Sequence, residues 1–227
     1  MDERCLIDVR GLYELLLDHM GPTHWWPADT RFEIAIGAIL TQNTAWGNVE
    51  TALDRMKAAD VLNARSIADL PDETLWDLIR STGYYRQKAV YLRAFCQWFL
   101  DLGEWSHDDA IPGLVRDRDD ETLRRELLSI RGVGGETADD LLLYVFDRPA
   151  FIADRYARRM FETLGVDDLP KSYEGFRRRV MPQIDADAWS IPEFQEFHGL
   201  IDELGKTCRT PEDWNHSIVA GYRMPLP

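Results

Sequence analysis

The chain has 227 residues, of which 45% are hydrophobic and 11% aromatic, so it has enough apolar surface for one large or two small domains with a sizeable core. Its formal net charge of −14 argues against a protein that coats nucleic acid without selectivity, because the overall field repels phosphate. The longest apolar runs fall short of the roughly 20 residues of a membrane span, and the three widely spaced cysteines indicate reduced thiols, so we expect a cytoplasmic protein.

The hydrophobic pattern predicts helices almost throughout. Apolar residues recur at helical spacing, and Gly, Pro or Asp separates one helical segment from the next. No segment alternates between apolar and polar residues for long enough to predict a sheet. We therefore expect an all-α fold, with helices at residues 6–20, 31–40, 48–59, 66–68, 72–81, 86–102 and 120–130 and an extended tail at residues 224–227.

A glycine-rich turn follows residue 130. Gly132, Gly134 and Gly135 occupy three of four successive positions, and a second helical segment begins at once. Glycine tolerates the positive φ that so tight a hairpin needs. Without side chains in the way, the N–H groups at the start of the second helix form a site for an anion such as phosphate. The same pattern is also typical of an ordinary corner between two helices with a glycine cap.

An aspartate follows this hairpin at position 154. Asp154 directly precedes a helical segment that begins Arg155-Tyr156-Ala157, and aspartate is a favoured N-cap residue. The local sequence therefore predicts a helix cap. A carboxylate in this place could also take part in chemistry.

These motifs, taken in order, resemble those of one enzyme family. Residues 128–138 and the following Asp154 resemble the helix-hairpin-helix motif and catalytic aspartate of the endonuclease III superfamily of DNA glycosylases. Residues 32–44 resemble the helix and loop that open the barrel of that superfamily. Residues 83–89 resemble the loop and helix start that press into DNA opposite the extruded base.

The resemblance covers most of the chain and implies a two-lobed helical fold. A six-helix barrel that contains the hairpin would span residues 31–144. Residues 1–30 and 145–227 would form a second, discontinuous helical domain. In this family the damaged base enters the cleft between the two lobes.

Two departures from endonuclease III narrow the resemblance. Glu136 stands where bifunctional members carry the lysine that forms a Schiff base with the sugar, and a carboxylate cannot act as an amine nucleophile. Only Cys208 remains of the four-cysteine iron–sulfur loop, and one thiolate cannot hold a cluster. Both losses, together with Trp25-Trp26-Pro27, residues 41–46 and Phe197-His198-Gly199, resemble the endonuclease III-related 3-methyladenine DNA glycosylases, the third bacterial type.

The resemblance assigns two catalytic candidates. Cleavage of an N-glycosidic bond builds positive charge on the deoxyribose, and Asp154 would stabilise that charge and orient the attacking water. Lys206 matches a lysine that this branch places near the pocket, although near a helix end it could equally pair with the helix dipole.

Aromatic side chains are the candidates for base binding. A base alkylated at N3 or N7 is cationic, and an indole face attracts a cation by roughly 0.5–2 kcal/mol. Trp25, Trp26, Pro27 and Trp46 are the predicted base-binding residues, with Trp46 the preferred stacking ring and one of Trp25 and Trp26 expected to support the other. Adjacent tryptophans before a proline are also common in cores.

Further residues are predicted to contact DNA. Tyr84 stands where family members insert a side chain into the gap left by base flipping, and a surface tyrosine on a turn is the alternative. Gln42 could probe the orphaned base or only brace its loop. The full predicted DNA-binding set is Gln42, Tyr84, Arg86, Lys88, Gly132, Gly134, Gly135 and Glu136.

The expected cofactor content is small. We expect no iron–sulfur cluster, and the carbonyls of Leu128, Ile130 and Val133 could hold a monovalent cation, Na⁺ or K⁺, unless they are capped internally. The expected partner is double-stranded DNA with damaged bases. We expect a monomer without membrane association, in the bacterial cytoplasm near the nucleoid.

The predicted function is monofunctional excision of alkylated purines in base excision repair. The predicted substrates carry a methyl group at N3 or N7, with etheno adducts as a further possibility. Two alternatives stay open at this point. One is a bifunctional glycosylase that also cuts the strand, which would need another amine such as Lys206. The other is a lesion-binding protein without catalysis, against which the presence of Asp154 argues.

Overall fold

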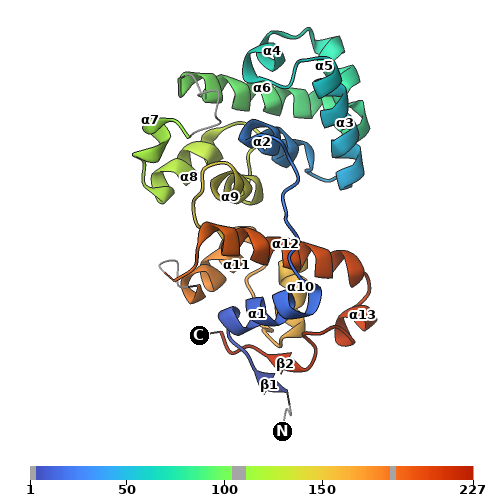
Figure 1. Cartoon of the computed structure of the whole chain (residues 1–227), viewed down its shortest axis with the longest axis vertical. Coiled ribbons are helices and arrows are strands. Elements are labelled where there is room, and N and C mark those ends of the chain that lie inside the picture. Colours follow the sequence, from blue (N-terminus) through green and yellow to red (C-terminus); the bar gives the residue numbers. More distant parts are fainter. Residues whose placement is uncertain (1–3, 104–110, 185–187, 227) are drawn as a thin grey trace. The chain divides into compact units, whose positions relative to one another are not determined.

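The computed structural model describes residues 4–103, 111–184 and 188–226. The chain divides into two compact units: residues 28–148 form one, and residues 1–27 together with 149–227 form the other (Figure 1). The predicted barrel boundaries, 31 and 144, lie just inside the observed ones. The predicted all-α class is confirmed, since the described strands are only two residues long.

The unit formed by residues 28–148 is helical along its described length. Its elements are α2 Arg31–Leu40, α3 Trp46–Ala58, α4 Ala64–Asp69, α5 Asp72–Ile79, the 3₁₀ helix η1 Arg80–Thr82, α6 Tyr85–Asp101, α7 Gly113–Arg116, α8 Asp120–Ser129 and α9 Gly135–Tyr144. The predicted helices of this unit begin and end within two residues of these bounds. Helix α7 was not predicted, because four residues are too few to show a helical period.

Helix α2 lies at the centre of this unit. The Thr30 side chain accepts the Glu33 N–H and begins the helix, and eight of its ten residues are buried. A helix that is apolar almost all round must be covered on every side. The one acid of this helix, Glu33, is buried and paired with Lys57 at 2.6 Å, so its charge is compensated.

The second unit joins the two ends of the described chain. Its elements are β1 Cys5–Leu6, α1 Val9–Met20, α10 Arg155–Thr163, α11 Tyr173–Val180, the 3₁₀ helix η2 Met181–Gln183, α12 Ile191–Thr207, α13 Pro211–Asn215 and β2 Tyr222–Arg223. Strands β1 and β2 pair in parallel, with Cys5 opposite Tyr222. The first helix therefore begins at Val9 and not at residue 6, and Asp8 caps it by accepting the Gly11 N–H at 2.7 Å.

Aromatic rings fill the core of this second unit. Helices α10 and α12 pack together, and α1 lies against α12. The rings that contact one another are Tyr13, Phe151, Phe161, Phe176, Trp189, Phe194 and Phe197. Such edge-on and tilted contacts add about 0.5–1.5 kcal/mol each beyond the burial of apolar area.

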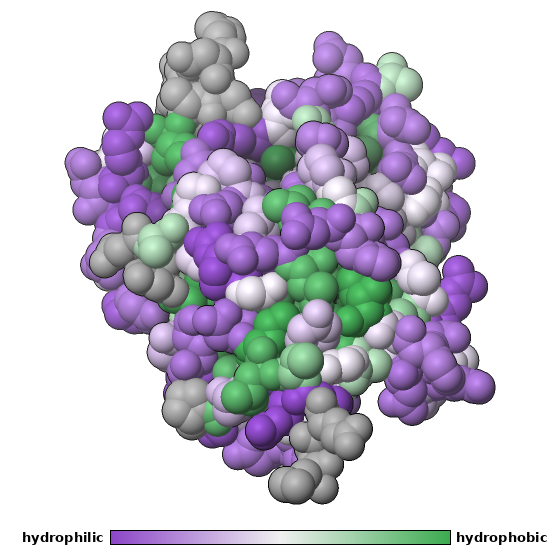
Figure 2. All heavy atoms as spheres, turned by 60° about the horizontal axis from the view of Figure 1, so that its bottom comes forward, coloured by the Kyte–Doolittle hydropathy of each residue, from purple (hydrophilic) through white to green (hydrophobic). Residues whose placement is uncertain are grey.

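The face shown in Figure 2 is mainly hydrophilic at its edges, with apolar side chains gathered nearer its middle. Leu6 on β1 is one exposed apolar residue, with 63% of its surface accessible. A shallow hollow beside it is lined by Leu6, Ile7, Gly11 and Pro225. None of the described helices is long and apolar enough to cross a membrane.

Candidate functional site

The hairpin between α8 and α9 turns at Gly132. This residue has φ +93°, and a Cβ placed on it would lie 2.1 Å from Cγ of Tyr91 on α6. Any side chain here would therefore clash with the ring as well as strain the backbone. Gly134 has an ordinary extended conformation, with φ −92° and ψ −178°, and Gly135 is the first residue of α9. Of the three glycines, only Gly132 has the positive φ expected from the sequence.

The N-terminus of α9 is open to a ligand. Gly134 is the N-cap of α9 and is exposed, and no side chain of the described residues caps this helix. A Cβ on Gly134 would meet nothing within 4 Å. The N–H groups of the first turn and the positive end of the helix dipole together favour a bound anion.

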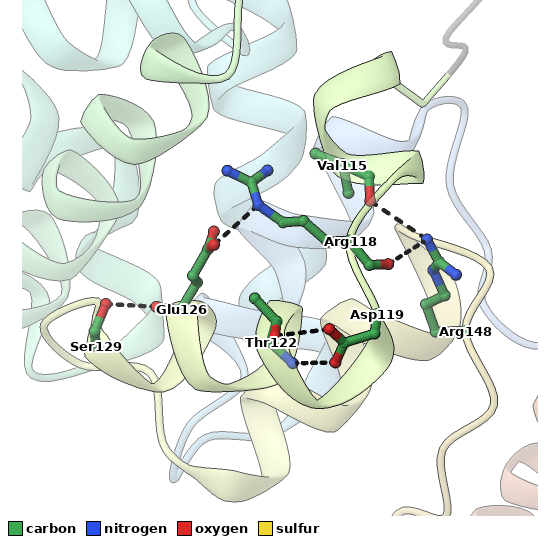
Figure 3. Close-up of polar contacts among 7 residues, drawn as sticks. All are labelled: Val115, Arg118, Asp119, Thr122, Glu126, Ser129 and Arg148. Atoms are coloured by element: carbon green, nitrogen blue, oxygen red, sulfur yellow. Dashed lines mark hydrogen bonds and ion pairs between the residues drawn. The ribbon is translucent and has the colours of Figure 1, made fainter.

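Helix α8 is held in place by a set of polar contacts at its N-terminal side (Figure 3). Asp119 caps the helix and accepts both the N–H and the hydroxyl of Thr122, each at 2.8 Å. Arg148 donates to the carbonyl oxygens of Val115 and Arg118, and the Arg118 guanidinium is paired with Glu126 at 2.9 Å. These contacts fix the direction in which α8 enters the hairpin.

A buried ion pair joins the two hairpin helices. Nε of Arg124 on α8 lies 2.8 Å from Oδ1 of Asp139 on α9, and a second guanidinium nitrogen lies 3.2 Å from Oδ2. The two side chains are 8% and 0% exposed. We did not predict this pair, although a possible signal was present: one basic and one acidic residue at core-facing positions on either side of the hairpin.

Asp154 is the N-cap of α10. Its Oδ1 accepts the N–H of Ala157 at 2.8 Å, so the predicted cap is confirmed. The carboxylate is partly exposed, whereas the preceding Ile152 and Ala153 are buried. The cap bond fixes the rotamer of this carboxylate, and the buried residues before it fix its backbone. Asp154 is therefore held rigidly at the start of a helix, in the unit formed by both chain ends.

Trp25 packs against Gly199 of helix α12, in the same unit as Asp154. A Cβ on Gly199 would lie 2.3 Å from Oγ1 of Thr23 and 2.9 Å from Cβ of Trp25, so this close approach requires glycine. The rings of Trp25 and Trp26 are 5.4 Å apart and tilted by 41°. Both tryptophans are half-buried, and Pro27 is exposed.

Lys206 contacts the Trp25 ring from the last turn of α12. Its Nζ lies 4.7 Å from the ring centroid, 2.6 Å from Asp202 and 2.8 Å from Glu203. Burial disfavours the charged form of this amine, but the hydrogen bonds to the two carboxylates outweigh that effect and raise the pKa of Lys206. A protonated amine is not a nucleophile. One indole face of Trp25 is thus already next to a cation, which suits Trp25 to the supporting role.

His198 also lies on α12, where the charges of Asp202 and Lys206 act on its ring. Burial lowers the pKa of its ring to about 4, and the charge of Lys206 lowers it further while Asp202 acts in the opposite direction. The ring is therefore neutral at physiological pH. A neutral, partly buried imidazole fits a structural role better than a catalytic one.

The depressed pKa of His198 predicts acid sensitivity. Below about pH 6.5 the unfolded chain protonates this ring while the folded protein does not, so the free energy of unfolding falls as the pH falls toward 4. The loss is at most about 3 kcal/mol, since one pKa unit corresponds to about 1.4 kcal/mol. Urea unfolding at several pH values should show a shallower acid slope for His198→Gln than for the wild type. Parallel slopes would contradict this assignment.

Trp46 and Gln42 belong to the other unit. Trp46 is the first residue of α3 and is half-buried. The side-chain amide of Gln42 donates to the Gly132 carbonyl at 2.9 Å and to the Thr137 hydroxyl at 3.1 Å. Gln42 therefore braces the hairpin, which is the alternative that the sequence left open, and its contact with an orphaned base stays a prediction.

Tyr84 projects from the turn before α6. It is 72% exposed and has φ +45°, directly after Gly83 with φ +66°. Arg86 is also exposed, and its guanidinium lies 4.9 Å from the centroid of the Trp76 ring. An exposed ring on a tight turn beside a stacked arginine is suitable for contact with DNA.

The predicted DNA contact of Lys88 is wrong for its side chain. Lys88 is only 2% exposed, and its Nζ donates to the carbonyl oxygens of Leu40 at 2.9 Å and Thr82 at 2.7 Å. Its position two residues after Arg86 places it on the opposite, inner face of α6, where a phosphate cannot reach the amine.

The absence of an iron–sulfur cluster stays a prediction, which the surroundings of Cys208 support. Cys208 is buried, and burial together with nearby Asp213 raises its pKa, which disfavours the thiolate that a cluster needs. Among the described residues, no group of three or more His, Cys, Asp or Glu side chains could hold a metal ion. The Ile130 carbonyl already accepts the Val133 N–H at 3.0 Å. A monovalent cation at the hairpin therefore remains a prediction.

Comparison with known proteins matches these features to one family. Residues 36–184 match the model of the HhH-GPD superfamily base excision DNA repair proteins. A protein of Methanocaldococcus jannaschii, whose name assigns it provisionally to the DNA repair glycosylases, is 39% identical over 88% of this chain and 89% of its own length. Endonuclease III of Thermotoga maritima is 25% identical over 80% of this chain and 76% of its own length.

A solved structure extends this likeness. The 3-methyladenine DNA glycosylase MagIII of H. pylori, bound to 1,N6-ethenoadenine, superposes with a TM-score of 0.72 and 26% identity over 88% of this chain and 98% of that protein. The family model, which matches residues 36–184 of this chain, covers both the hairpin and Asp154. The chain belongs to the HhH-GPD superfamily and is a base excision repair DNA glycosylase related to endonuclease III.

Proposed function

We propose that this protein is a monofunctional DNA glycosylase that releases alkylated purines by hydrolysis of the N-glycosidic bond. The observation that carries the proposal is that the chain has a rigid carboxylate at Asp154, the N-cap of α10, but has a carboxylate and not an amine at Glu136. The similarity to a 3-methyladenine glycosylase supports the choice of alkylated purines.

Asp154 supplies the chemistry that hydrolysis requires. As the base leaves, positive charge develops on the deoxyribose, and a nearby carboxylate stabilises that charge and orients the attacking water. A base methylated at N3 or N7 is already cationic and a good leaving group, so a general acid contributes little. A single fixed carboxylate is sufficient for this reaction.

The described site lacks a suitable amine for strand cleavage. Glu136 is exposed in the first turn of α9, where its charge is stabilised by the helix dipole. Lys206 is held protonated by Asp202 and Glu203, and Lys88 is buried against two carbonyl groups. Neither lysine is placed to form a Schiff base.

We expect the protein to release 3-methyladenine or 7-methylguanine and to leave the strand intact until alkali is added. Duplexes that carry these lesions or ethenoadenine should be assayed with and without the alkali step, and borohydride should trap no covalent adduct. A trapped adduct, or nicking before alkali, would falsify monofunctional hydrolysis. The matched control is Glu136→Lys, which restores an amine at this position and tests whether borohydride can detect one.

Base recognition is assigned to aromatic rings. Trp46 is proposed to stack on the cationic base, and Trp26, supported by Trp25, is proposed as a further base-binding ring. Lys206, Asp202 and Glu203 together carry a net charge of −1, which is compatible with a cationic ligand near Trp25. An indole face attracts a cationic base through a cation–π interaction, which the neutral parent base does not make.

Replacing Trp46 should reduce the excision of a cationic base. Trp46→Leu removes an attraction of about 0.5–2 kcal/mol, so 3-methyladenine excision should fall about 2- to 30-fold, whereas Trp46→Phe should keep much of the activity. Thermal melting checks the fold of each variant. Trp98→Leu is the control, because it removes a half-buried indole from α6 of the same unit. If Trp46→Leu is as active as the wild type, the base stacks elsewhere.

DNA binding is assigned to the hairpin and to the turn before α6. The N–H groups at the N-terminus of α9, where Gly134 is the N-cap, would hold a backbone phosphate. Tyr84 would fill the gap left by the flipped base and offset part of the few kcal/mol of unstacking. Arg86, already stacked on Trp76, would contact the strand nearby.

A further inference from the structure

Helix α6 connects three loops of the unit formed by residues 28–148. Tyr84, at its N-terminus, carries the exposed ring. One turn later, Lys88 donates to the carbonyl oxygens of Leu40 and Thr82 at 2.9 and 2.7 Å. Tyr91, three residues further along, packs against the backbone of Gly132 in the hairpin.

The two carbonyl groups that Lys88 holds lie at the start of two of these loops. Leu40 is the last residue of α2, and its carbonyl is at the negative end of the helix dipole. The next residues carry Gln42, which is hydrogen-bonded to Gly132. Thr82 is the last residue of η1 and is followed directly by Gly83 and Tyr84. One ammonium group thus connects the loop of Gln42 to the turn of Tyr84.

Burying a lysine costs more free energy than burying an apolar side chain of the same length. Burial lowers the pKa of Lys88 to about 8, so the amine is mostly charged at neutral pH and both carbonyl groups gain a charge-assisted hydrogen bond. A methionine in this place would avoid the cost of burying a charge but would leave both carbonyl groups without this donor. The cost points to a role in fixing geometry.

We propose that Lys88 is a positioning residue that holds the Tyr84 turn and the Gln42 loop as one rigid surface, so that insertion of Tyr84 into DNA is coupled to binding at the hairpin. The proposal rests on the proposed function in that Tyr84 is taken as the inserted side chain. We call the two hydrogen bonds of Lys88 the clamp. Without the clamp, the Tyr84 turn would have to become ordered when the protein binds DNA, and the entropic cost would cancel the binding free energy that insertion provides.

A double-mutant cycle between Lys88 and Tyr84 tests this coupling. The probe is a duplex that carries a tetrahydrofuran abasic analogue, with the undamaged duplex as reference. Because this probe has no base to recognise or excise, the test is independent of lesion preference and of Asp154. We expect Tyr84→Ala to weaken binding to the abasic duplex about tenfold in the wild type, relative to undamaged DNA, but less than twofold in Lys88→Met.

The controls separate positioning from stability. Ile67→Ala removes a buried side chain of α4 from the same unit and should lower the melting temperature while keeping the full tenfold effect of Tyr84→Ala. Lys88→Arg keeps donors for both carbonyl groups and should restore the effect. If Lys88→Met does not fold, Lys88→Gln takes its place, since its amide is too short to reach both carbonyl groups.

Two results would overturn the proposal. Tyr84→Ala could weaken binding equally in the wild-type and Lys88→Met proteins, and then the clamp would serve folding alone. Alternatively, Tyr84→Ala could have no effect in the wild type, and then there would be no insertion to position. Failure of the excision assays, with this cycle intact, would instead reject the proposed lesion chemistry.

Discussion

Asp154→Asn should reduce excision of alkylated purines by about 10²–10³-fold while leaving DNA affinity within a few fold of the wild type. Asparagine is as good an N-cap as aspartate, so the 2.8 Å bond from the Ala157 N–H and the start of α10 should be retained. The amide carries no negative charge and cannot stabilise the developing positive charge on the sugar. Single-turnover excision and binding to a lesion duplex measure the two effects separately.

The matched control makes the same chemical change at another helix cap. Asp8 caps α1 in the same unit and accepts the Gly11 N–H at 2.7 Å, so Asp8→Asn tests the effect of losing one carboxylate charge from a cap. Asp8→Asn should keep wild-type excision. If Asp154→Asn is nearly as active as the wild type, Asp154 serves as a cap and the catalytic group lies elsewhere.

Removing either partner of the Arg124–Asp139 pair should give the largest loss of stability. Arg124→Met or Asp139→Leu leaves one buried charge without its partner, which costs about 3–5 kcal/mol, because the remaining side chain is almost fully enclosed. The double variant Arg124→Met/Asp139→Leu should lose much less, since it leaves no uncompensated charge. Urea unfolding followed by tryptophan fluorescence measures these differences.

A partly exposed ion pair between Arg118, which precedes α8, and Glu126 on α8 provides the comparison. Arg118 and Glu126 are 26% and 34% exposed, and Glu126→Gln should change the free energy of unfolding by no more than about 1 kcal/mol. If the single Arg124 and Asp139 variants are as mild as Glu126→Gln, the pair is not an important link between α8 and α9. If the double variant is as unstable as the singles, side-chain packing and not charge is the cause.

Features that depend on neighbouring residues were predictable from the sequence. Helix α2 begins and ends where predicted, because an apolar run and the Thr30 cap determine both ends locally. The hairpin was recognisable because its glycines interrupt two amphipathic segments. The cap formed by Asp154 followed from its place before α10, since capping needs only the next three residues.

Features that depend on distant residues were not predictable. Strand β1 forms only because Cys5 and Leu6 meet Tyr222 and Arg223, and no local pattern in two residues could indicate this pairing. Lys88 was assigned to DNA because it is basic and close to Tyr84 in sequence. Its orientation depends on where the Leu40 and Thr82 carbonyl groups lie, which only the folded chain determines.

The pairing of β1 with β2 has a consequence for synthesis on the ribosome. Residues 28–148 are continuous and can fold as soon as they have left the exit tunnel. Helix α1, although translated before residues 28–148, must wait for α12, and β1 must wait for residues 222–223. The nascent polypeptide therefore carries β1 and α1 without their packing partners while residues 28–148 are synthesised, and helix α10, which Asp154 caps, gains its neighbour α12 only after residue 207 has been translated.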